Sequence, residues 1–398
     1  MDCLTKFNSP QLKTLHRGKV RDSIRIDDQT RMIVVTDRIS AFNKKIKTPI
    51  PTKGAVLNGI ANFWFDQTKH IVDNHIIQQV DDYITLVKEA VPIRVEMVVR
   101  AYLTGSMWRG YEAGQRTFSG VTVGDGMVKN QRFEHPILTP TTKDEDDTEI
   151  DEQGILGAGL VSAPIYDQMK EKALAIFNFA SIFLGERGII LVDTKYEFGL
   201  LDGQLIIIDE MHTPDSSRFW SADDYAKNPT AAAQIDKEFV RQWMLSNKVN
   251  GEVPLVLIPE IIAETSNRYQ EIYNTVTGQV FNLVDMPSKV RVYHNLVKAG
   301  VLKTAVVAIV MDNLSQKSEA ARLEKELAAY DLCVQQVLLA DIDELSATYN
   351  QTIEPVAIIA LGQTQPTLDA HMTVPITSNS KDALRGLNLH ALRTALDK

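Results

Sequence analysis

Three charged residues at alternate positions, Asp193, Lys195 and Glu197, interrupt an otherwise apolar segment. A period of two places all three on one face of an extended strand. Residues 202–203, Asp-Gly, then predict a hairpin turn, and the returning strand ends at Asp209. Carboxylates beside a cation suit a Mg²⁺-nucleotide site, because Mg²⁺ takes hard oxygen ligands together with substrate phosphates. Taken alone, the alternation would equally suit a solvated hairpin face with ordinary ion pairs.

The length of this hairpin turn decides whether the two strands could share a metal ion. A two-residue turn at 202–203 pairs Glu197 with Ile208 and sends Asp209 to the opposite face. A three-residue turn at 202–204 pairs Glu197 with Asp209 directly. A shared metal ion requires this second register, and the sequence allows either.

A basic stripe in segment 15–26 is a second candidate site. Alternation places Arg17, Lys19 and Arg21 on one face of a predicted hairpin, beside Gly18. The glycine permits close approach of the backbone, and the cations can make charge-assisted hydrogen bonds to phosphate. In isolation the stripe is also consistent with an exposed basic hairpin.

Together these segments resemble the SAICAR synthetase (phosphoribosylaminoimidazole-succinocarboxamide synthase) family over roughly the first 285 residues. The motifs that carry the resemblance occur in the family's order: His16-Arg17-Gly18-Lys19-Val20-Arg21-Asp22, Asp37-Arg38-Ile39-Ser40-Ala41-Phe42, Pro51-Thr52-Lys53-Gly54, the segment 92–100 with Thr104-Gly105-Ser106, the segments 192–199, 209–210 and 214–220, Arg268-Tyr269 and Thr277-Gly278. The resemblance implies an α+β fold in two parts, with an antiparallel-sheet N-terminal subdomain and an α/β ATP-binding subdomain.

The resemblance also implies a reaction. The family is an ATP-dependent carbon-nitrogen ligase of de novo purine biosynthesis that joins carboxyaminoimidazole ribonucleotide (CAIR) and L-aspartate, giving SAICAR, ADP and phosphate. A carboxylate does not react with an amine at neutral pH, because oxide would have to leave; phosphorylation by ATP supplies an acyl phosphate instead. ATP and Mg²⁺ are therefore the expected cofactors, and catalysis should rest on positioning and electrostatics. The alternative is a noncatalytic or altered-substrate homologue that acts as a nucleotide-binding or assembly protein.

Residue roles follow from the same resemblance. The expected catalytic residues are Asp193, Lys195, Glu197 and Asp209, of which the last two would hold Mg²⁺. The expected nucleotide-binding residues are Gly18, Lys19, Arg21 and Glu96. The expected substrate-binding residues are Ser40, Arg100, Ser106, Lys143, Asp215, Ser217 and Arg218. Within that set, Arg100, Ser106 and Arg218 would hold the ribonucleotide phosphate. The general base for the aspartate amine is left open between Asp215, Glu210 and solvent.

Two loops depart from the family pattern. Asn43 follows Ser-Ala-Phe, where the family usually has Asp. The acidic segment 146–150 replaces a common His-Asp-Glu-Asn-Ile run. Each change removes or relocates a carboxylate, whereas the strand motifs around Glu197 and Asp209 are unaffected.

The chain is expected to divide into an N-terminal nucleotide-loop subdomain (1–90), an ATP- and ribonucleotide-binding subdomain (91–285), a linker (286–303) and a small domain (304–398). The last block alternates strands and helices, at 304–311, 319–330, 334–339, 356–361 and 381–396. This alternation predicts a small, flavodoxin-like, three-layer α/β domain with a parallel sheet.

The last block also faintly resembles the aminoimidazole ribonucleotide carboxylase (PurE-type) domain that some organisms fuse after the synthetase. The match rests on Ala308-Ile309-Val310-Met311 and the order of elements. The Gly-Ser-Asp-Ser-Asp loop of that family is replaced by Asp312-Asn313-Leu314-Ser315-Gln316. We therefore expect a noncatalytic module, with the whole protein a monomer or a homo-oligomer through this domain.

Composition narrows the class of protein. The 398 residues carry a net charge of -9, which argues against nonspecific binding to nucleic acid. Only Cys3 and Cys333 are present, as expected of a reduced, cytoplasmic protein without a disulfide framework. No apolar run approaches membrane-spanning length, so no membrane partner is expected.

Overall fold

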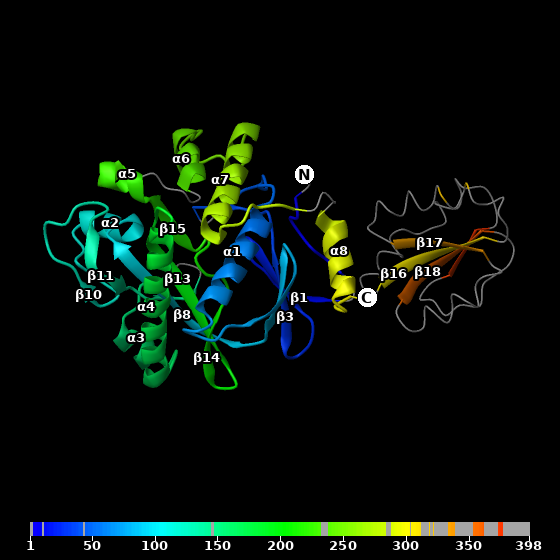
Figure 1. Cartoon of the computed structure of the whole chain (residues 1–398), viewed down its shortest axis with the longest axis horizontal. Helices are drawn as coiled ribbons and strands as arrows, with labels where there is room; N and C mark the ends of the chain where they lie inside the picture. The colour runs from blue at the N-terminus through cyan, green and yellow to red at the C-terminus, as the bar shows by residue number, and fades with distance from the viewer. Residues whose placement is uncertain are drawn as a thin grey trace. The chain divides into compact units, whose positions relative to one another are not determined.

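The computed structural model describes residues 3–302 except 10–11, 43, 145–146, 232–237 and 284–287, together with 304–311, 318, 321, 333–338, 353–361 and 373–376 of the tail. Two compact units emerge: residues 1–6 with 15–285, and residues 7–14 with 286–398 (Figure 1). Residues 15–285 thus lie in a single unit, across the expected boundary at residue 90. Each unit is treated by itself below.

A five-stranded sheet forms the N-terminal part of the first unit, in the order β1-β2-β3-β7-β6. Its strands are β1 (Lys13–Arg17), β2 (Arg21–Arg25), β3 (Thr30–Val35), β6 (Ile76–Asp81) and β7 (Ile84–Lys88). The β2–β3, β3–β7 and β6–β7 pairs are antiparallel, which confirms the prediction for this block. Alternation buries Ile24 and leaves Arg21 and Arg25 outside the core. Helix α1 (Lys53–Thr68) packs against β3 and β6.

A second sheet of six strands carries the residues of most interest. Its main path is β11 (Arg132–Leu138), β8 (Val91–Tyr102), β13 (Ile189–Leu201) and β14 (Gln204–Ile208), in that order. β12 (Thr141–Thr142) also pairs with β8, and β15 (Ser217–Ser221) with β13.

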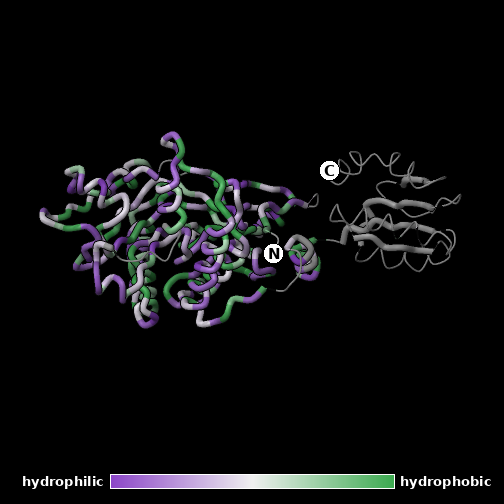
Figure 2. Tube along the Cα trace, turned by 90° about the horizontal axis from the view of Figure 1, so that it is seen from above, coloured by the Kyte–Doolittle hydropathy of each residue, from purple (hydrophilic) through white to green (hydrophobic). Residues whose placement is uncertain are grey.

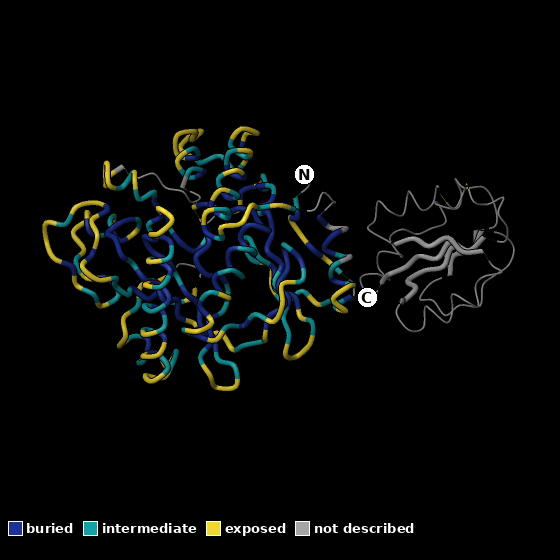
Figure 3. Tube along the Cα trace, viewed as in Figure 1, coloured by how far each residue is buried: buried dark blue, intermediate teal, exposed yellow. Residues whose placement is uncertain are grey.

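One face of this second sheet is covered by α4 (Ala163–Gly185). Met169, Ile176 and Ala180 of α4 lie in one buried cluster with Tyr196 and Phe198 of β13. The strands and α1 are the most buried parts of the first unit (Figure 3). Because adjacent strand residues point to opposite faces, Asp193, Lys195 and Glu197 must face away from α4.

The hairpin between β13 and β14 has a two-residue turn. Leu201 pairs with Gln204 and Glu197 with Ile208. Asp202 and Gly203 both have positive φ, 52° and 81°, as a turn that matches strand twist requires. The three-residue register that would pair Glu197 directly with Asp209 is therefore wrong.

The remaining elements of the first unit are short strands and peripheral helices. They are β4 (Ser40–Ala41), β5 (Lys44–Lys45), α2 (Gly105–Glu112), β9 (Thr117–Phe118), β10 (Val121–Thr122), α3 (Glu152–Gly157), α5 (Ala222–Lys227), the 3₁₀ helix Pro229–Ala231, α6 (Glu238–Ser246) and α7 (Pro259–Thr277).

The second unit contains α8 (Ser288–Lys298) and a four-stranded sheet. Its strands are β16 (Thr304–Met311), β17 (Cys333–Leu338), β18 (Ile353–Leu361) and β19 (Thr373–Ile376), in the order β17-β16-β18-β19. All pairs are parallel, as the sequence predicted. Strand β19 was not foreseen, and the expected linker contains a helix. The helices expected at 319–330 and 381–396 lie outside the described residues, apart from the single position 321.

Among the described residues, no helix is both long and apolar enough to cross a membrane. In the first unit, hydrophobic and hydrophilic stretches alternate along the chain (Figure 2).

Candidate active site

The pairing of β8 with β13 builds a charged face on the second sheet. Arg100 lies opposite Asp193, and Glu96 lies opposite Glu197. Lys195 stands between the two pairs, opposite Val98. Directly opposed residues share a face of the sheet, so the two strands bring together the charged groups that the sequence placed on each of them separately.

Two lysines neutralise the carboxylates at one end of this face. Lys195 Nζ lies 2.8 and 2.9 Å from the two carboxylate oxygens of Glu96. Burial works against its charge, but Glu96 outweighs burial and raises the pKa of Lys195. Lys143, from the loop after β12, forms an ion pair with Glu197. Here burial prevails and lowers the pKa of Lys143.

The opposite end of the charged face gathers two arginines around one carboxylate. Asp193 Oδ2 lies 3.3 Å from Arg100 Nη1 and 3.4 Å from Arg218 Nη1. Arg100 is further fixed by its Nε, which donates to Thr139 Oγ1 at 2.8 Å. With two cations for one carboxylate, this end carries the excess positive charge that a phosphate group needs.

Helix α2 begins beside these arginines. Gly105, its first residue, has φ +61°, and a Cβ built there would overlap the Arg218 guanidinium. Ser106 follows and is exposed. The first amides of a helix have no intrahelical partner, so a helix N-terminus beside arginines is suited to an anion.

The predicted nucleotide loop is a tight turn between β1 and β2. Gly18 N–H donates to Arg21 O at 2.7 Å, and a Cβ at Gly18 would lie 2.7 Å from that oxygen, so only glycine fits. Arg38 stabilises the turn by donating hydrogen bonds to Gly18 O at 3.3 Å and to Lys19 O at 3.2 Å. Its guanidinium also binds Asp22 at 2.6 Å.

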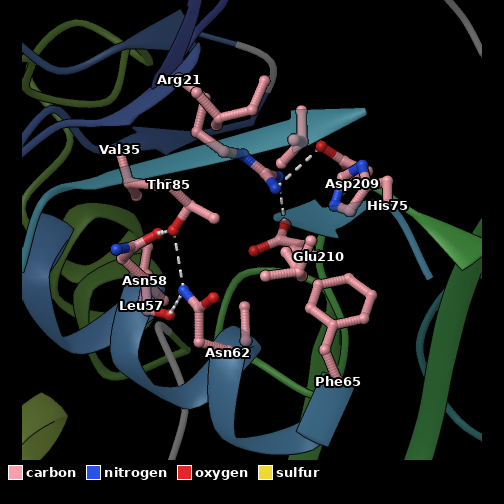
Figure 4. A pocket seen from close by; sticks show the side chains of 14 residues that line it. Arg21, Val35, Leu57, Asn58, Asn62, Phe65, His75, Thr85, Asp209 and Glu210 are labelled. Atoms are coloured by element: carbon pink, nitrogen blue, oxygen red, sulfur yellow. Dashed lines mark hydrogen bonds and ion pairs between the residues drawn. The ribbon is translucent and has the colours of Figure 1, made fainter. Parts of the chain in front are cut away.

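Arg21 links the nucleotide loop to the end of β14. Its guanidinium lies between two carboxylates (Figure 4), with Nη1 2.9 Å from Asp209 Oδ1 and Nη2 paired with Glu210. Burial opposes the charge, but the two carboxylates raise the pKa of Arg21 above its usual value. Arg21 was expected to bind ATP phosphates; in this structure its guanidinium is engaged by protein carboxylates instead.

Asp209 is close to the charged face despite the two-residue turn. Its φ of 69° lies in the left-handed region, so strand alternation no longer decides where its side chain points. Burial would raise the pKa of Asp209, but Arg21, Lys143 and Lys195 together lower it. The two lysines that hold Glu96 and Glu197 therefore also act on Asp209.

A small cavity of about 20 Å³ lies behind Arg21, lined by Asn58, Asn62 and His75 among others. Burial lowers the pKa of His75 to about 4, so this neighbour of Asp209 is neutral at pH 7 (Figure 4). The charge of Asp209 is thus balanced by Arg21 and the two lysines, and not by an imidazolium.

Three expected substrate-binding residues are not on the charged face. Ser217 pairs with Thr194, and their buried hydroxyls lie 2.7 Å apart on the opposite side of β13, so its contact with substrate stays a prediction that this pairing does not support. Ser40 lies in the short β4–β5 hairpin. Asp215 binds Lys53 and Tyr269. Asn43 and part of the acidic loop, residues 145–146, lie outside the described residues.

Sequence reasoning missed the roles of Lys53 and Arg38. Both stand inside segments that were singled out only for their resemblance to family motifs. Nothing in the sequence around Lys53 indicates that this lysine is buried. Thr139, which orients Arg100, carried no signal at all.

The chain is similar to known proteins of one family. The SAICAR synthetase family model matches residues 14–255. The phosphoribosylaminoimidazole-succinocarboxamide synthase of Bacteroides thetaiotaomicron is 41% identical over 293 residues, which span 71% of this chain and 93% of the relative. That of Azobacteroides pseudotrichonymphae is 40% identical over 285 residues, 70% of this chain and 88% of the relative. The structure of SAICAR synthase from Saccharomyces cerevisiae complexed with SAICAR matches with a TM-score of 0.65 and 32% identity, covering 70% of this chain and 100% of that one.

Proposed function

This chain belongs to the SAICAR synthetase family, and we propose that the charged face of β8 and β13 is where it joins CAIR to L-aspartate at the expense of ATP. The reaction is an ATP-dependent carbon-nitrogen ligation in de novo purine biosynthesis. The observation that carries the site assignment is the register that sets Arg100 against Asp193 and Glu96 against Glu197. This register gives the face one cation-rich end and one carboxylate-rich end, as a substrate with a phosphate and a second, reacting acid group requires.

The ribonucleotide would lie with its 5′-phosphate at the α2 end of the face. Arg100 and Arg218 supply the guanidinium groups, and Ser106 supplies a hydroxyl and a helix N-terminal amide. Asp193 holds both arginines in place. The imidazole-carboxylate end of CAIR then extends toward Lys195, whose cation favours the reacting carboxylate.

ATP would approach from the nucleotide loop. The loop is a tight turn in which only glycine fits at residue 18, and Lys19 supplies a cation for the phosphates. Glu96 is the carboxylate that holds Lys195 at this end.

The carboxylates at this end fit Mg²⁺. Among the described residues no group of three metal-ligating side chains is close enough to form a complete protein cage. Mg²⁺ typically takes one or two carboxylates and completes its shell with phosphates and water, so two suffice. Glu197 and Asp209 would hold it although the two-residue turn does not pair them, because the positive φ of Asp209 frees its side chain from strand alternation and Lys143 acts on both carboxylates. The bound ion would neutralise charge on the transferred phosphoryl group.

The reaction has two balanced steps. A carboxylate oxygen of CAIR attacks the γ-phosphorus, the bond to the β,γ-bridging oxygen breaks, and ADP leaves. The amine of aspartate then attacks the acyl carbon, phosphate leaves with the former carboxylate oxygen, and the amine proton passes to solvent or phosphate. Lys143 and Lys195 hold cationic charge beside the transferred group, while Arg100 and Arg218 fix the far end of the substrate.

Oxygen labelling tests this assignment. CAIR that carries ¹⁸O in its carboxylate should pass one labelled oxygen to the released phosphate in each turnover. Unlabelled phosphate from active enzyme would contradict the acyl-phosphate route, because the oxygen lost from the carboxylate would then have left as water.

The remaining expectations concern the setting of the enzyme. We propose a cytoplasmic enzyme, because two cysteines in 398 residues are typical of a chain kept in a reducing compartment. We further propose that 1–90 and 91–285 act as nucleotide-loop and substrate-binding subdomains. The tail from 304 would be a noncatalytic, three-layer assembly domain, since its parallel strands resemble a carboxylase scaffold but residues 312–316 replace the Gly-Ser-Asp-Ser-Asp loop of the carboxylase family.

A further inference from the structure

The first residue of α1 is a lysine that is completely buried. The Lys53 side chain is 0% exposed, and its Nζ lies 2.7 Å from Asp215 Oδ2. The other oxygen of Asp215 accepts a hydrogen bond from the Tyr269 hydroxyl at 3.1 Å. The ammonium group also lies 5.7 Å from the centre of the Tyr269 ring. The Lys53–Asp215–Tyr269 junction therefore joins α1, the loop before β15, and α7.

Burying the ammonium group of Lys53 at this junction costs free energy, for two reasons. A buried ammonium group loses its hydration and must be paired. A cation in the first turn of a helix is also repelled by the positive end of the helix dipole. Burial of both partners, with Asp215 only 7% exposed, leaves no room for either to act as an ordinary surface ion pair.

Two sides of the junction are firmly tied to each other. Ser266 Oγ of α7 donates to Pro51 O at 2.8 Å, and Gln270 Nε2 donates to Thr52 Oγ1 at 3.1 Å. Residues 51 and 52 immediately precede Lys53. The start of α1 and the middle of α7 thus form one fixed support, and Asp215 attaches the third element to it.

The attached element leads directly to the phosphate end of the charged face. The loop 213–216 is a compact turn in which Ser216 N–H donates to Thr213 O at 3.1 Å. Lys195 N–H donates to Ser216 O at 3.3 Å. Arg218 follows three residues after Asp215, and its guanidinium lies against Gly105 with little free space. A shift of the loop would therefore carry Arg218 out of register with Asp193.

We infer that Lys53 and Tyr269 are positioning residues that fix Arg218 for the ribonucleotide phosphate by holding Asp215. This inference rests on the proposed function and deepens it. It also replaces the expectation that Asp215 contacts substrate, because both of its carboxylate oxygens already bind protein groups.

The test is steady-state kinetics of Lys53→Met in the full chain. Methionine keeps the length of the side chain but removes the charge. The Michaelis constant for CAIR should rise about tenfold, while kcat and the Michaelis constants for ATP and L-aspartate change by less than about threefold. Lys69→Met is the matched control, because Lys69 comes directly after α1 and forms an exposed pair with Asp66. Its constants should equal those of the parent.

A second variant covers the case in which Lys53→Met does not fold. Tyr269→Phe removes one hydrogen bond to Asp215 and keeps the ring, so it should raise the Michaelis constant for CAIR in the same direction by a smaller factor. Unchanged constants for CAIR in the folded variants would overturn the inference and leave the junction purely structural. A rise for L-aspartate alone would also overturn it, by indicating that Asp215 binds the amine. Inactivity of the parent protein would instead refute the proposed function.

Discussion

At the scale of single residues, the charged face is a set of ion pairs that a substrate must rearrange. Glu96, Glu197 and Asp209 are each held by a cation of the protein. A polyanionic substrate competes for those cations, and a metal ion competes for the carboxylates. The two should therefore bind better together than apart, since each releases the partners that the other needs.

Glu197→Gln tests the metal-binding end of the face. The amide cannot replace the carboxylate as a Mg²⁺ ligand, so kcat should fall by about a hundredfold or more while the circular dichroism spectrum is unchanged. The control is Glu89→Gln, which disrupts a partly buried ion pair with Arg31 at the first sheet. ATP-dependent turnover in Glu197→Gln at the rate of the parent protein would contradict the assignment of Glu197 as a Mg²⁺ ligand.

Much of this face could be predicted from sequence, because strand alternation alone decides that Asp193, Lys195 and Glu197 share a side. The position of the Asp209 side chain could not be predicted. Its positive φ breaks the strand alternation at the residue whose side-chain direction decides whether a metal ion can be shared. The place of Ser217 could not be predicted for a related reason. Its hydroxyl suggested phosphate binding, but its register opposite Thr194 turns it into the buried side of the sheet.

At the scale of elements, the start of α2 and the start of β15 meet at one corner, where we propose that the ribonucleotide phosphate binds. Gly105 permits the Arg218 guanidinium to lie against the helix backbone, and the β13–β15 pairing brings Arg218 to Asp193. The turn residues and the arginine could be recognised from sequence. Their contact could not, because residues 105 and 218 come together only through the second sheet.

Gly105→Ala should disrupt this corner. The new Cβ would overlap the Arg218 guanidinium, and the positive φ is itself unfavourable for alanine. We expect the Michaelis constant for CAIR to rise by about tenfold or more, with a smaller change for ATP. Gly157→Ala in α3 is the control, because a Cβ there meets no atom within 4 Å. Equal effects of Gly105→Ala on all three substrates would argue against a phosphate site at this corner.

At the scale of the whole molecule, the chain combines a unit that matches the synthetase family with a tail beyond the matched residues. The Bacteroides thetaiotaomicron relative matches 71% of this chain but 93% of its own length, so a complete relative corresponds to the first unit. The parallel pairing of β16, β17 and β18 agrees with the alternation of apolar segments. The placement of residues 7–14 with the tail could not be predicted, because no local pattern marks a long-range contact.

Truncation after Asp285 tests this division of labour. Synthetase turnover should remain measurable, because the site residues all lie before that point. Solubility should fall or the oligomeric state should change, since segment 7–14 loses the unit with which it clusters. Size-exclusion chromatography measures the oligomeric state of the truncated protein, and the turnover assay measures its synthetase activity. Conversion of aminoimidazole ribonucleotide and carbonate to CAIR by the full chain would show that the tail is a working carboxylase.

The most direct test of the central claim is ADP release by the full chain, measured with CAIR, ATP and Mg²⁺ in the presence and absence of L-aspartate. Sustained release of ADP should require both CAIR and L-aspartate, with one SAICAR formed for each ADP. ADP release that ignores L-aspartate, or none at all from correctly folded protein with all three substrates, would contradict the assignment of this chain as a working SAICAR synthetase.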